Sequence, residues 1–241
     1  MGKRYECKLP IPSIAVIGLQ SSGKSSLIEA FLGLKFNYVK DDIGTKCPLI
    51  LQLENDPNQF DPLWDTSDVR LAPASSSSIT LTTQQVRERL TAFNSNLKTI
   101  DGKPLTLRLR YRYCANLTLI DLPGFRLVGS TELSIAISNV VKEQVEQLDR
   151  IVVCVENAAV DKSGTYAVSF MKNGADPDLK RTVIVFNQFD KQLGTLMSQP
   201  SENIEENLVI PESLGVPKRV PAFYTSMPHG KRSETLNSNE L

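Results

Sequence analysis

Two glycines five positions apart, followed directly by lysine and serine, place the strongest restriction on how this chain can fold. The segment Gly18-Leu-Gln-Ser-Ser-Gly23-Lys24-Ser25 fits the spacing G-x-x-x-x-G-K-[ST]. The apolar run Ile14–Ile17 precedes it as a buried strand would, apolar residues at helical spacing follow it from Lys24 to Leu34, and Gly33 is the expected helix stop. A strand, a glycine-rich turn and a helix in this order aim successive backbone N–H groups at one point. The sequence therefore predicts a phosphate-binding loop.

The residues of this loop are suited to a nucleoside triphosphate. Lys24 is expected to reach the β- and γ-phosphates, and the Ser25 hydroxyl to take one coordination position on Mg²⁺. The helix that begins near Lys24 adds its positive dipole end. We expect the nucleotide to contact the following residues of the loop: Gly18, Ser22, Gly23, Lys24, Ser25 and Ser26. The loop alone does not choose the base.

The composition excludes several other classes of protein. The chain has 241 residues, and its 27 Lys and Arg balance its 27 Asp and Glu, so the formal net charge is zero. A balanced charge argues against nucleic-acid binding, which usually shows a basic excess. His229 is the one histidine, which leaves no room for a His-based triad or a His-rich metal site. No apolar run approaches the roughly 18 residues of a membrane span. Four scattered cysteines without a CxxC pair fit a reducing, cytosolic compartment.

Strand and helix patterns alternate along the chain, which predicts an α/β fold with a mainly parallel central sheet and helices on both faces. The expected strands are 14–17, 49–53, 105–111, 117–120, 151–155, 182–186 and 220–224, and the expected helices are 24–34, 83–97, 133–148 and 163–172. Residues 54–80 are rich in Asp, Pro and Ser and are expected to form a mobile loop or insertion. We assign residues 1–228 to one domain and 229–241 to a polar, disordered tail.

A second polar element follows the expected strand 117–120. In Asp121-Leu-Pro-Gly124, Asp121 is placed to hold Mg²⁺ through a water molecule, and the Gly124 N–H to bond the γ-phosphate. Thr45, in the loop before the strand 49–53, is placed to close the cage around the metal. These residues extend the predicted phosphate site to a metal ion.

A third element, Asn187-Gln-Phe-Asp190, follows the expected strand 182–186 and has the shape of the [NT]-K-x-D signature of GTPases. The aspartate of that signature accepts hydrogen bonds from guanine N1–H and the 2-amino group, which adenine cannot supply. Gln188 replaces the lysine, so the charge and the aliphatic stem that normally pack beside the base are altered. The sequence predicts guanine recognition by Asp190, with Asn187 and Gln188 beside it.

Together these elements resemble the GTPase domain of the dynamin superfamily, from about Ile11 to Met227. The resemblance rests on Gln20-Ser-Ser-Gly-Lys-Ser-Ser26, Gly44-Thr-Lys-Cys-Pro-Leu-Ile-Leu-Gln-Leu53 and Asn116-Leu-Thr-Leu-Ile-Asp-Leu-Pro-Gly124. Small Ras-like GTPases lack the Gln-Ser-Ser start and the Thr-x-x-Pro element. Gly33-Leu-Lys-Phe-Asn37 and Gln188 are similar to the plant and algal branch that constricts dividing plastids.

The resemblance implies roles for further residues. Gln20 and Ser21 correspond to residues that place the attacking water and help to neutralise charge between the β- and γ-phosphates. Thr45 corresponds to the residue that holds Mg²⁺ and this water. Asp161 corresponds to a contact with the partner protomer across the nucleotide, and Thr225-Ser226 to positions beside the guanine.

The chain departs from the family pattern in two further ways. The family usually carries two glycines ahead of the loop threonine, whose carbonyls bind a monovalent cation, whereas Lys40-Asp-Asp-Ile43 stands there in this chain. Because backbone carbonyls do not need glycine, use of K⁺ or Na⁺ stays open. The long helices of the stalk and bundle, which drive polymerisation, are missing, so we expect an excised catalytic domain.

We therefore expect the Mg²⁺-dependent GTP-hydrolysing domain of a dynamin-like mechanoenzyme of membrane or organelle division, stimulated by homodimerisation through the nucleotide face. GTP and GDP are the expected ligands, nucleic acid is not expected, and membrane association would need parts missing from this chain. The expected location is the cytoplasm, with recruitment to an organelle surface such as the plastid. Two alternatives stay open. A GTP-dependent assembly module with negligible hydrolysis is favoured by Gln188 and Lys40–Ile43, and a P-loop ATPase or kinase is disfavoured by Asp190.

Overall fold

The computed structural model describes residues 11–37, 45–71, 78–127, 129–159, 165–197 and 214–227. The strands are β1 Ser13–Gly18, β2 Leu49–Glu54, β3 Leu63–Thr66, β4 Ile79–Leu81, β5 Leu105–Arg110, β6 Leu117–Asp121, β7 Arg150–Asn157, β8 Thr182–Asn187 and β9 Ala222–Tyr224. The helices are α1 Lys24–Leu32, α2 Thr83–Asn96, α3 Thr131–Val145, α4 Tyr166–Lys172 and α5 Phe189–Met197. The expected tail 229–241 lies outside the described residues.

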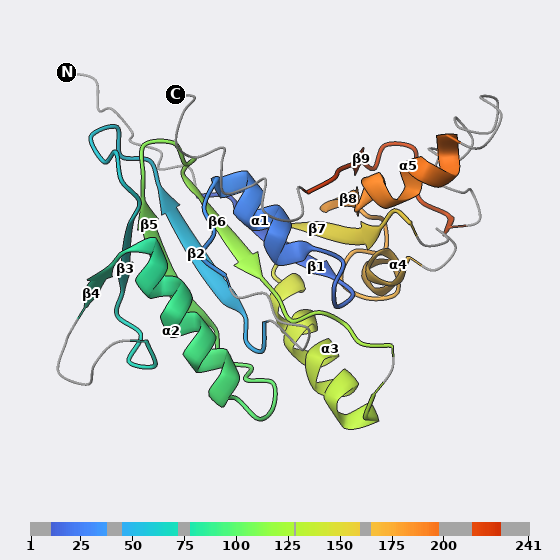
Figure 1. Ribbon diagram of the computed structural model, residues 1–241. Coiled ribbons are helices and arrows are strands. Elements are labelled where there is room, and N and C mark those ends of the chain that lie inside the picture. The colour runs from blue at the N-terminus through green and yellow to red at the C-terminus, as the bar shows by residue number, and fades with distance from the viewer. Residues whose placement is uncertain are drawn as a thin grey trace, which may run out of the picture.

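The nine strands form one sheet in the order β4-β3-β5-β2-β6-β1-β7-β8-β9 (Figure 1). Five of the eight pairings are parallel: β1 with β6 and β7, β2 with β5, and β8 with β7 and β9. β2 runs antiparallel to β6, and β3 runs antiparallel to β4 and β5. The predicted α/β fold with a mainly parallel sheet is confirmed. Because β6, β1 and β8 point the same way, their carboxyl ends, with Asp121, Gly18 and Asn187, reach the same edge of the sheet.

Helices pack on both faces of this sheet, as the sequence predicts. In β1, Val16 joins one buried apolar cluster, while Ala15 and Ile17 join another, because successive strand residues point to opposite faces. The first cluster takes in α1 and α2, through Ile28, Leu32, Val86 and Leu90. The second takes in α3 and α4, through Ile137, Val141, Val168 and Met171. Burial on both faces fixes the strand ends that carry the predicted site.

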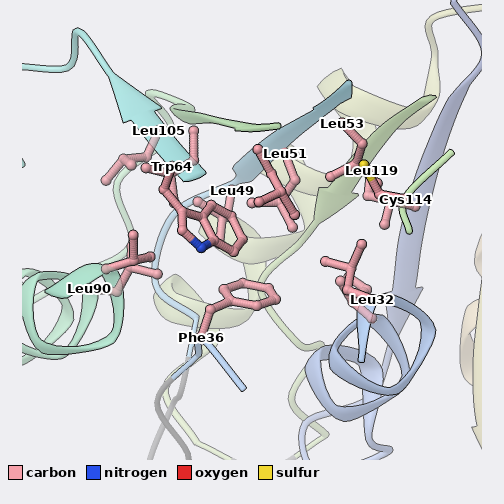
Figure 2. Packing of buried hydrophobic residues seen from close by; sticks show 14 of the residues in the cluster. Leu32, Phe36, Leu49, Leu51, Leu53, Trp64, Leu90, Leu105, Cys114 and Leu119 are labelled. Carbon is pink, nitrogen blue, oxygen red and sulfur yellow. The ribbon is translucent and has the colours of Figure 1, made fainter. Parts of the chain in front are cut away.

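The segment 54–80 corrects one prediction, because it contributes β3 and β4 to the sheet instead of forming only a mobile loop. Trp64 of β3 is fully buried, its indole N–H donates to Thr83 Oγ1 at 3.0 Å, and its ring centroid lies 5.3 Å from that of Phe36 (Figure 2). Composition misses a four-residue strand of this kind, since cross-strand packing and burial decide its conformation. Residues 72–77, in the middle of the expected loop, lie outside the described residues.

The helix ends follow local chemistry. α1 ends at Leu32, because Gly33 adopts φ 67° and donates its N–H back to the last turn, as the predicted glycine stop implies. α2 begins after Thr82, whose side chain accepts from Gln85 N–H while the Gln85 side chain accepts from Thr82 N–H. The sequence did not predict α5. Among the described residues, no helix combines the length and the apolar character that crossing a membrane requires.

Candidate nucleotide site

The predicted phosphate-binding loop joins the carboxyl end of β1 to α1. Gly18 pairs with Val155 at the sheet edge, and Ser26 lies half-buried in the first turn of α1. Gly23 adopts φ 91° at the N-cap of α1, where a Cβ atom would lie 2.1 Å from Asn187 Nδ2. In the described part of the chain, no side chain caps this helix end, and the Ser22 hydroxyl is buried without a hydrogen-bond partner. A helix N-terminus with uncapped N–H groups suits an anion.

The Lys24 ammonium turns back onto its own loop. Lys24 Nζ donates to the carbonyls of Gly18 at 3.3 Å and Leu19 at 3.0 Å, and only 7 % of the residue is exposed. Burial lowers the pKa of Lys24 to about 8, although the negative charges of Asp121 and Glu156 act to raise it. A buried cation that is stabilised mainly by carbonyl groups gains from a phosphate ligand, because the phosphate supplies the missing counter-charge.

Three side chains from distant parts of the sequence meet at Asp121. Its Oδ2 atom accepts hydrogen bonds from Ser25 Oγ at 2.7 Å, Thr45 Oγ1 at 3.2 Å and Asn37 Nδ2 at 3.2 Å. Ser25 Oγ and Thr45 Oγ1 are themselves 3.5 Å apart. Burial raises the pKa of Asp121, while Lys24 and the three hydrogen bonds oppose this shift. The structure therefore brings together all three residues predicted to hold the metal.

This cluster fits Mg²⁺. Asp121 Oδ1 is buried and has no hydrogen-bond partner among the described residues, so one carboxylate oxygen is left to interact with a ligand. Carboxylate and hydroxyl oxygens are the ligands that Mg²⁺ takes together with phosphate oxygens and water. Within the described ranges, no three His, Cys, Asp or Glu side chains gather as an all-protein metal site would.

Asn37 is a site residue that the sequence analysis did not assign. Its side chain donates to Asp121, and its backbone N–H donates to Glu29 Oε1 on α1 at 2.7 Å. The preceding Phe36 is fully buried against Trp64, which fixes the direction in which the chain enters the site (Figure 2). The sequence analysis singled out residues 33–37 only for their similarity to the plant and algal branch. It gave no sign that the Asn37 side chain contacts Asp121.

Glu156 is the second unassigned group. It lies near the end of β7, is 4 % exposed, and its Oε1 accepts from the backbone N–H groups of Ala167 at 2.9 Å and Val168 at 3.2 Å. Burial raises the pKa of Glu156 to about 7, against the effects of these two N–H groups and of Lys24. Nothing in the sequence pattern around 156 indicated a buried carboxyl group, because its burial depends on the start of α4.

The predicted base-recognition element contacts the phosphate-binding loop directly. Asn187 Nδ2 donates to the carbonyl of Ser22 at 2.9 Å, and Gln188 Nε2 donates to the carbonyl of Ser21 at 2.8 Å. Gln188 adopts φ 61°, a left-handed conformation, and Lys191 Nζ donates to its Oε1 at 2.8 Å. Gln188 thus connects the base-recognition element to the phosphate-binding loop, although it stands where the signature has lysine.

Residues 225 and 226, which the resemblance places beside the guanine, contact the same element in the structure. Phe189 N–H donates to the Thr225 carbonyl at 3.0 Å, and Asp190 N–H donates to Ser226 Oγ at 2.8 Å. Thr225 Oγ1 donates to Asn187 Oδ1 at 3.3 Å. These bonds hold the first turn of α5, from which the exposed Asp190 reaches solvent. A guanine ring at Asp190 would lie next to this segment.

Gln20 and Gly124 are also brought together. Gln20 N–H donates to the carbonyl of Phe125 at 2.8 Å, and Phe125 N–H donates to the carbonyl of Gly18 at 3.0 Å. A Cβ atom at Gly124 would lie 2.8 Å from Gln20 Cα and 2.9 Å from Lys24 Nζ, so only glycine fits this approach. Ser21, with φ 62°, is exposed at the turn. Asp161 and Lys40–Ile43 lie outside the described residues.

Comparison with known proteins agrees with this arrangement. A family model described as "Dynamin family" matches residues 14–189. Dynamin-like protein C of Dictyostelium discoideum is 30% identical over 93% of this chain, and dynamin-related protein 5A of Arabidopsis thaliana is 35% identical over 77% of it. Dynamin-like protein ARC5 of Arabidopsis thaliana is 26% identical over 96% of the chain.

The fold is that of a P-loop GTPase domain, and the chain belongs to the dynamin family. The matched region makes up 29%, 24% and 31% of the three relatives, in the same order, so the chain spans less than a third of their length.

Proposed function

We propose that this chain is the GTP-binding and GTP-hydrolysing domain of a dynamin-like mechanoenzyme. The observation that carries the proposal is the meeting of Ser25, Thr45 and Asn37 on one oxygen of buried Asp121, beside Lys24 and the start of α1. Such a convergence of hydroxyls, carboxylate and cation has no role in packing the sheet. It suits a triphosphate with a divalent ion.

The residues of the loop have separable tasks in this proposal. The N–H groups at the start of α1 bind phosphate oxygens, and Lys24 exchanges the carbonyls of Gly18 and Leu19 for the β- and γ-phosphates. Gly124 offers its N–H to the γ-phosphate. Ser25, Thr45 and Asp121 would hold Mg²⁺, which would supply charge neutralisation on the phosphates when bound.

Guanine recognition rests on Asp190 in this proposal. Its carboxylate accepts hydrogen bonds from guanine N1–H and the 2-amino group, and adenine would leave it without these donors. Support comes from the hydrogen bonds of Asn187 and Gln188 to the loop carbonyls, which fix the distance between base and phosphates. Thr225 and Ser226 hold the first turn of α5 in place.

Hydrolysis requires that water attack the γ-phosphorus while the bond to the β-phosphate oxygen breaks, yielding GDP and phosphate. We assign the placing of this water to Gln20, Ser21 and Thr45, through ordering of the loops when two copies of the domain meet at their nucleotide faces. Asp161 contacts the partner copy in this arrangement, and K⁺ or Na⁺ assists near the phosphates. Arg126, half-buried just after Gly124, is the alternative source of positive charge.

Steady-state GTP hydrolysis over a wide range of protein concentration tests this proposal, in potassium, in sodium and in neither. Specific activity should rise with protein concentration, and Asp161→Ala should flatten the rise without weakening GTP binding. A specific activity that stays constant with protein concentration would contradict the dimer mechanism. A large loss of GTP hydrolysis in Arg126→Ala would indicate that an arginine of the same chain supplies the positive charge. Single-turnover assays that find tight GTP binding without hydrolysis would favour the assembly module instead.

At the cellular level, we propose a role in division of a membrane-bound organelle such as the plastid. The protein would act from the cytoplasm, with membrane association through parts outside this chain and no part played by nucleic acid. Two Arabidopsis thaliana proteins among the relatives support this choice of branch. Fluorescent tagging of the full-length protein in its own cells should show a band at the constriction of the dividing organelle. Uniform cytoplasmic fluorescence throughout division would contradict the proposal.

A further inference from the structure

The departure at Gln188 leaves the base-recognition element without the cation that the [NT]-K-x-D signature carries. Gln188 is 7 % exposed, and its amide uses both ends: Nε2 donates to the Ser21 carbonyl, and Oε1 accepts from Lys191 Nζ, each at 2.8 Å. A glutamine amide offers both a donor and an acceptor group, whereas a lysine ammonium offers donors only. This glutamine can therefore bind the loop and an ammonium group at the same time.

Lys191 stands where a cation could reach the nucleoside part of a bound nucleotide. It lies in the first turn of α5, one residue after Asp190, and its backbone N–H donates to the Gln188 carbonyl at 3.0 Å. Gln188 precedes α5 in a left-handed conformation, and this turn brings its side-chain oxygen to Lys191 Nζ. The chain of contacts from Lys191 through Gln188 to Ser21 spans the distance between the base element and the phosphate-binding loop.

The contacts also explain why a flexible lysine is held in this position. Lys191 is exposed, so its four-carbon side chain is among the more flexible parts of the site. The buried Gln188 amide supplies the restraint, because its Nε2 bond to the loop fixes the direction of Oε1. The left-handed φ of 61° at Gln188 is a conformation that a non-glycine residue rarely adopts, which indicates that the surrounding contacts determine this geometry.

We propose that Gln188 and Lys191 together replace the single lysine of the signature. Gln188 ties the base element to the phosphate-binding loop, and Lys191 provides the ammonium group beside the ribose and base of the nucleotide. Lys191 is thus a positioning and affinity-determining residue for a guanine nucleotide. This inference rests on the proposed GTP site and deepens it.

The test measures the affinity of the purified chain for a fluorescent GTP analogue, with inosine triphosphate and ATP as competitors. Lys191→Met should weaken GTP binding by about fivefold, the upper end of the range for a solvent-exposed charged pair, because the side chain is exposed. Lys191→Arg should keep most of the affinity. The loss should shrink as ionic strength rises. Lys180→Met, an exposed lysine at the opposite end of β8, is the matched control and should bind as the unaltered chain does.

The decisive variant combines Gln188→Lys with Lys191→Met. If one lysine can replace the pair, the two substitutions should compensate each other, as substitutions at coupled positions can. The double variant should then bind GTP with an affinity within about twofold of that of the unaltered chain. Thermal unfolding of each variant separates loss of affinity from loss of fold. If Lys191→Met binds normally, or if the double variant stays as weak as Lys191→Met, the inference is overturned while the GTP site stands. If the unaltered chain does not bind GTP, both the inference and the proposed function fail.

Discussion

At the phosphate end of the candidate site, three donors converge on an Asp121 carboxylate that is 1 % exposed, whereas at the base end the Asp190 residue is exposed, although Gln188 beside it is buried and reaches Ser21 in the phosphate-binding loop. The donors to Asp121 come from α1 and from two separate parts of the loop before β2, up to 96 residues away in sequence. At the base end, Lys191 reaches Gln188 over three residues.

The difference in burial indicates which end of the site tolerates substitution. A buried carboxylate must have its partners in place, since an unsatisfied charged group is expensive in a low-dielectric interior. One substitution at the phosphate end therefore disturbs several groups. At the base end, glutamine in place of lysine can be compensated by Lys191, because its exposed ammonium group needs no buried partner and still reaches the Gln188 amide.

The largest effect is expected for Lys24→Ala, which removes the main counter-charge of the phosphates. GTP affinity should fall by about 10²–10⁴-fold, because two charge-assisted hydrogen bonds of about 1.5–3 kcal/mol each are lost. Isothermal titration calorimetry measures this. The empty variant should unfold at the same temperature as the unaltered chain or higher, since a buried cation is removed. Near-normal GTP affinity would rule out the phosphate-loop assignment.

Thr45→Ala should separate catalysis from binding at the same end. Most of the GTP affinity should remain, while the rate of hydrolysis falls by something like the 10²–10³-fold loss that accompanies removal of one key transition-state contact. Single-turnover kinetics at saturating protein measure this rate. Thr106→Ala, on the half-buried strand β5, is a suitable control. An unchanged turnover rate would show that Thr45 plays no part in the reaction.

Asp190→Asn examines the base end. Unaltered protein should prefer GTP over ATP at least tenfold, roughly the effect of leaving the Asp190 carboxylate, covered by the bound base, without its two donors. The asparagine amide should shift this preference toward xanthosine triphosphate, whose carbonyl replaces the amino group of guanine. Competition binding with the three nucleotides gives the ratios. Equal GTP and ATP affinities before and after the change would mean that another residue reads the base.

Asn37→Ala tests whether Asn37, which contacts Asp121 but is not a predicted metal ligand, affects the binding of Mg²⁺. Loss of its amide should raise the Mg²⁺ concentration needed for half-maximal hydrolysis by about tenfold, as removal of groups that orient metal ligands usually does. The backbone bond to Glu29 is retained in this variant, so the fold should persist. A magnesium titration that superimposes on that of the unaltered chain would restrict Asn37 to a structural role.

The smallest effect concerns pH. The Lys24 pKa of about 8 means that the empty site loses its charge above this pH, whereas bound phosphates would keep the ammonium protonated. Binding then takes up a proton, so GTP affinity should be nearly constant below pH 7.5 and fall about fourfold between pH 7 and 8.5. Lys24→Arg should bind with no such decline, because a guanidinium stays charged. A flat profile for the unaltered chain would place the Lys24 pKa higher.

Much of this site could be predicted because its key residues follow strand ends. Gly18, Asp121 and Asn187 each follow or close an apolar run, and parallel strands bring such positions to one sheet edge. Asn37 and Glu156 could not be predicted, because each stands in a stretch without a motif and acts through residues far away. The donor Asn37 is 84 residues from Asp121, and Glu156 depends on the start of α4.

The phosphate-binding loop, the alternation of strands and helices, and the stop of α1 at Gly33 follow from the sequence, because glycine spacing and apolar period are local properties of a chain. Folding places Trp64 in the core beneath the site, brings three donors to Asp121 Oδ2, and lets Lys191 reach the phosphate-binding loop through Gln188. Those outcomes depend on burial and on contacts between distant segments. Desolvation and long-range packing set them, and no local pattern records either.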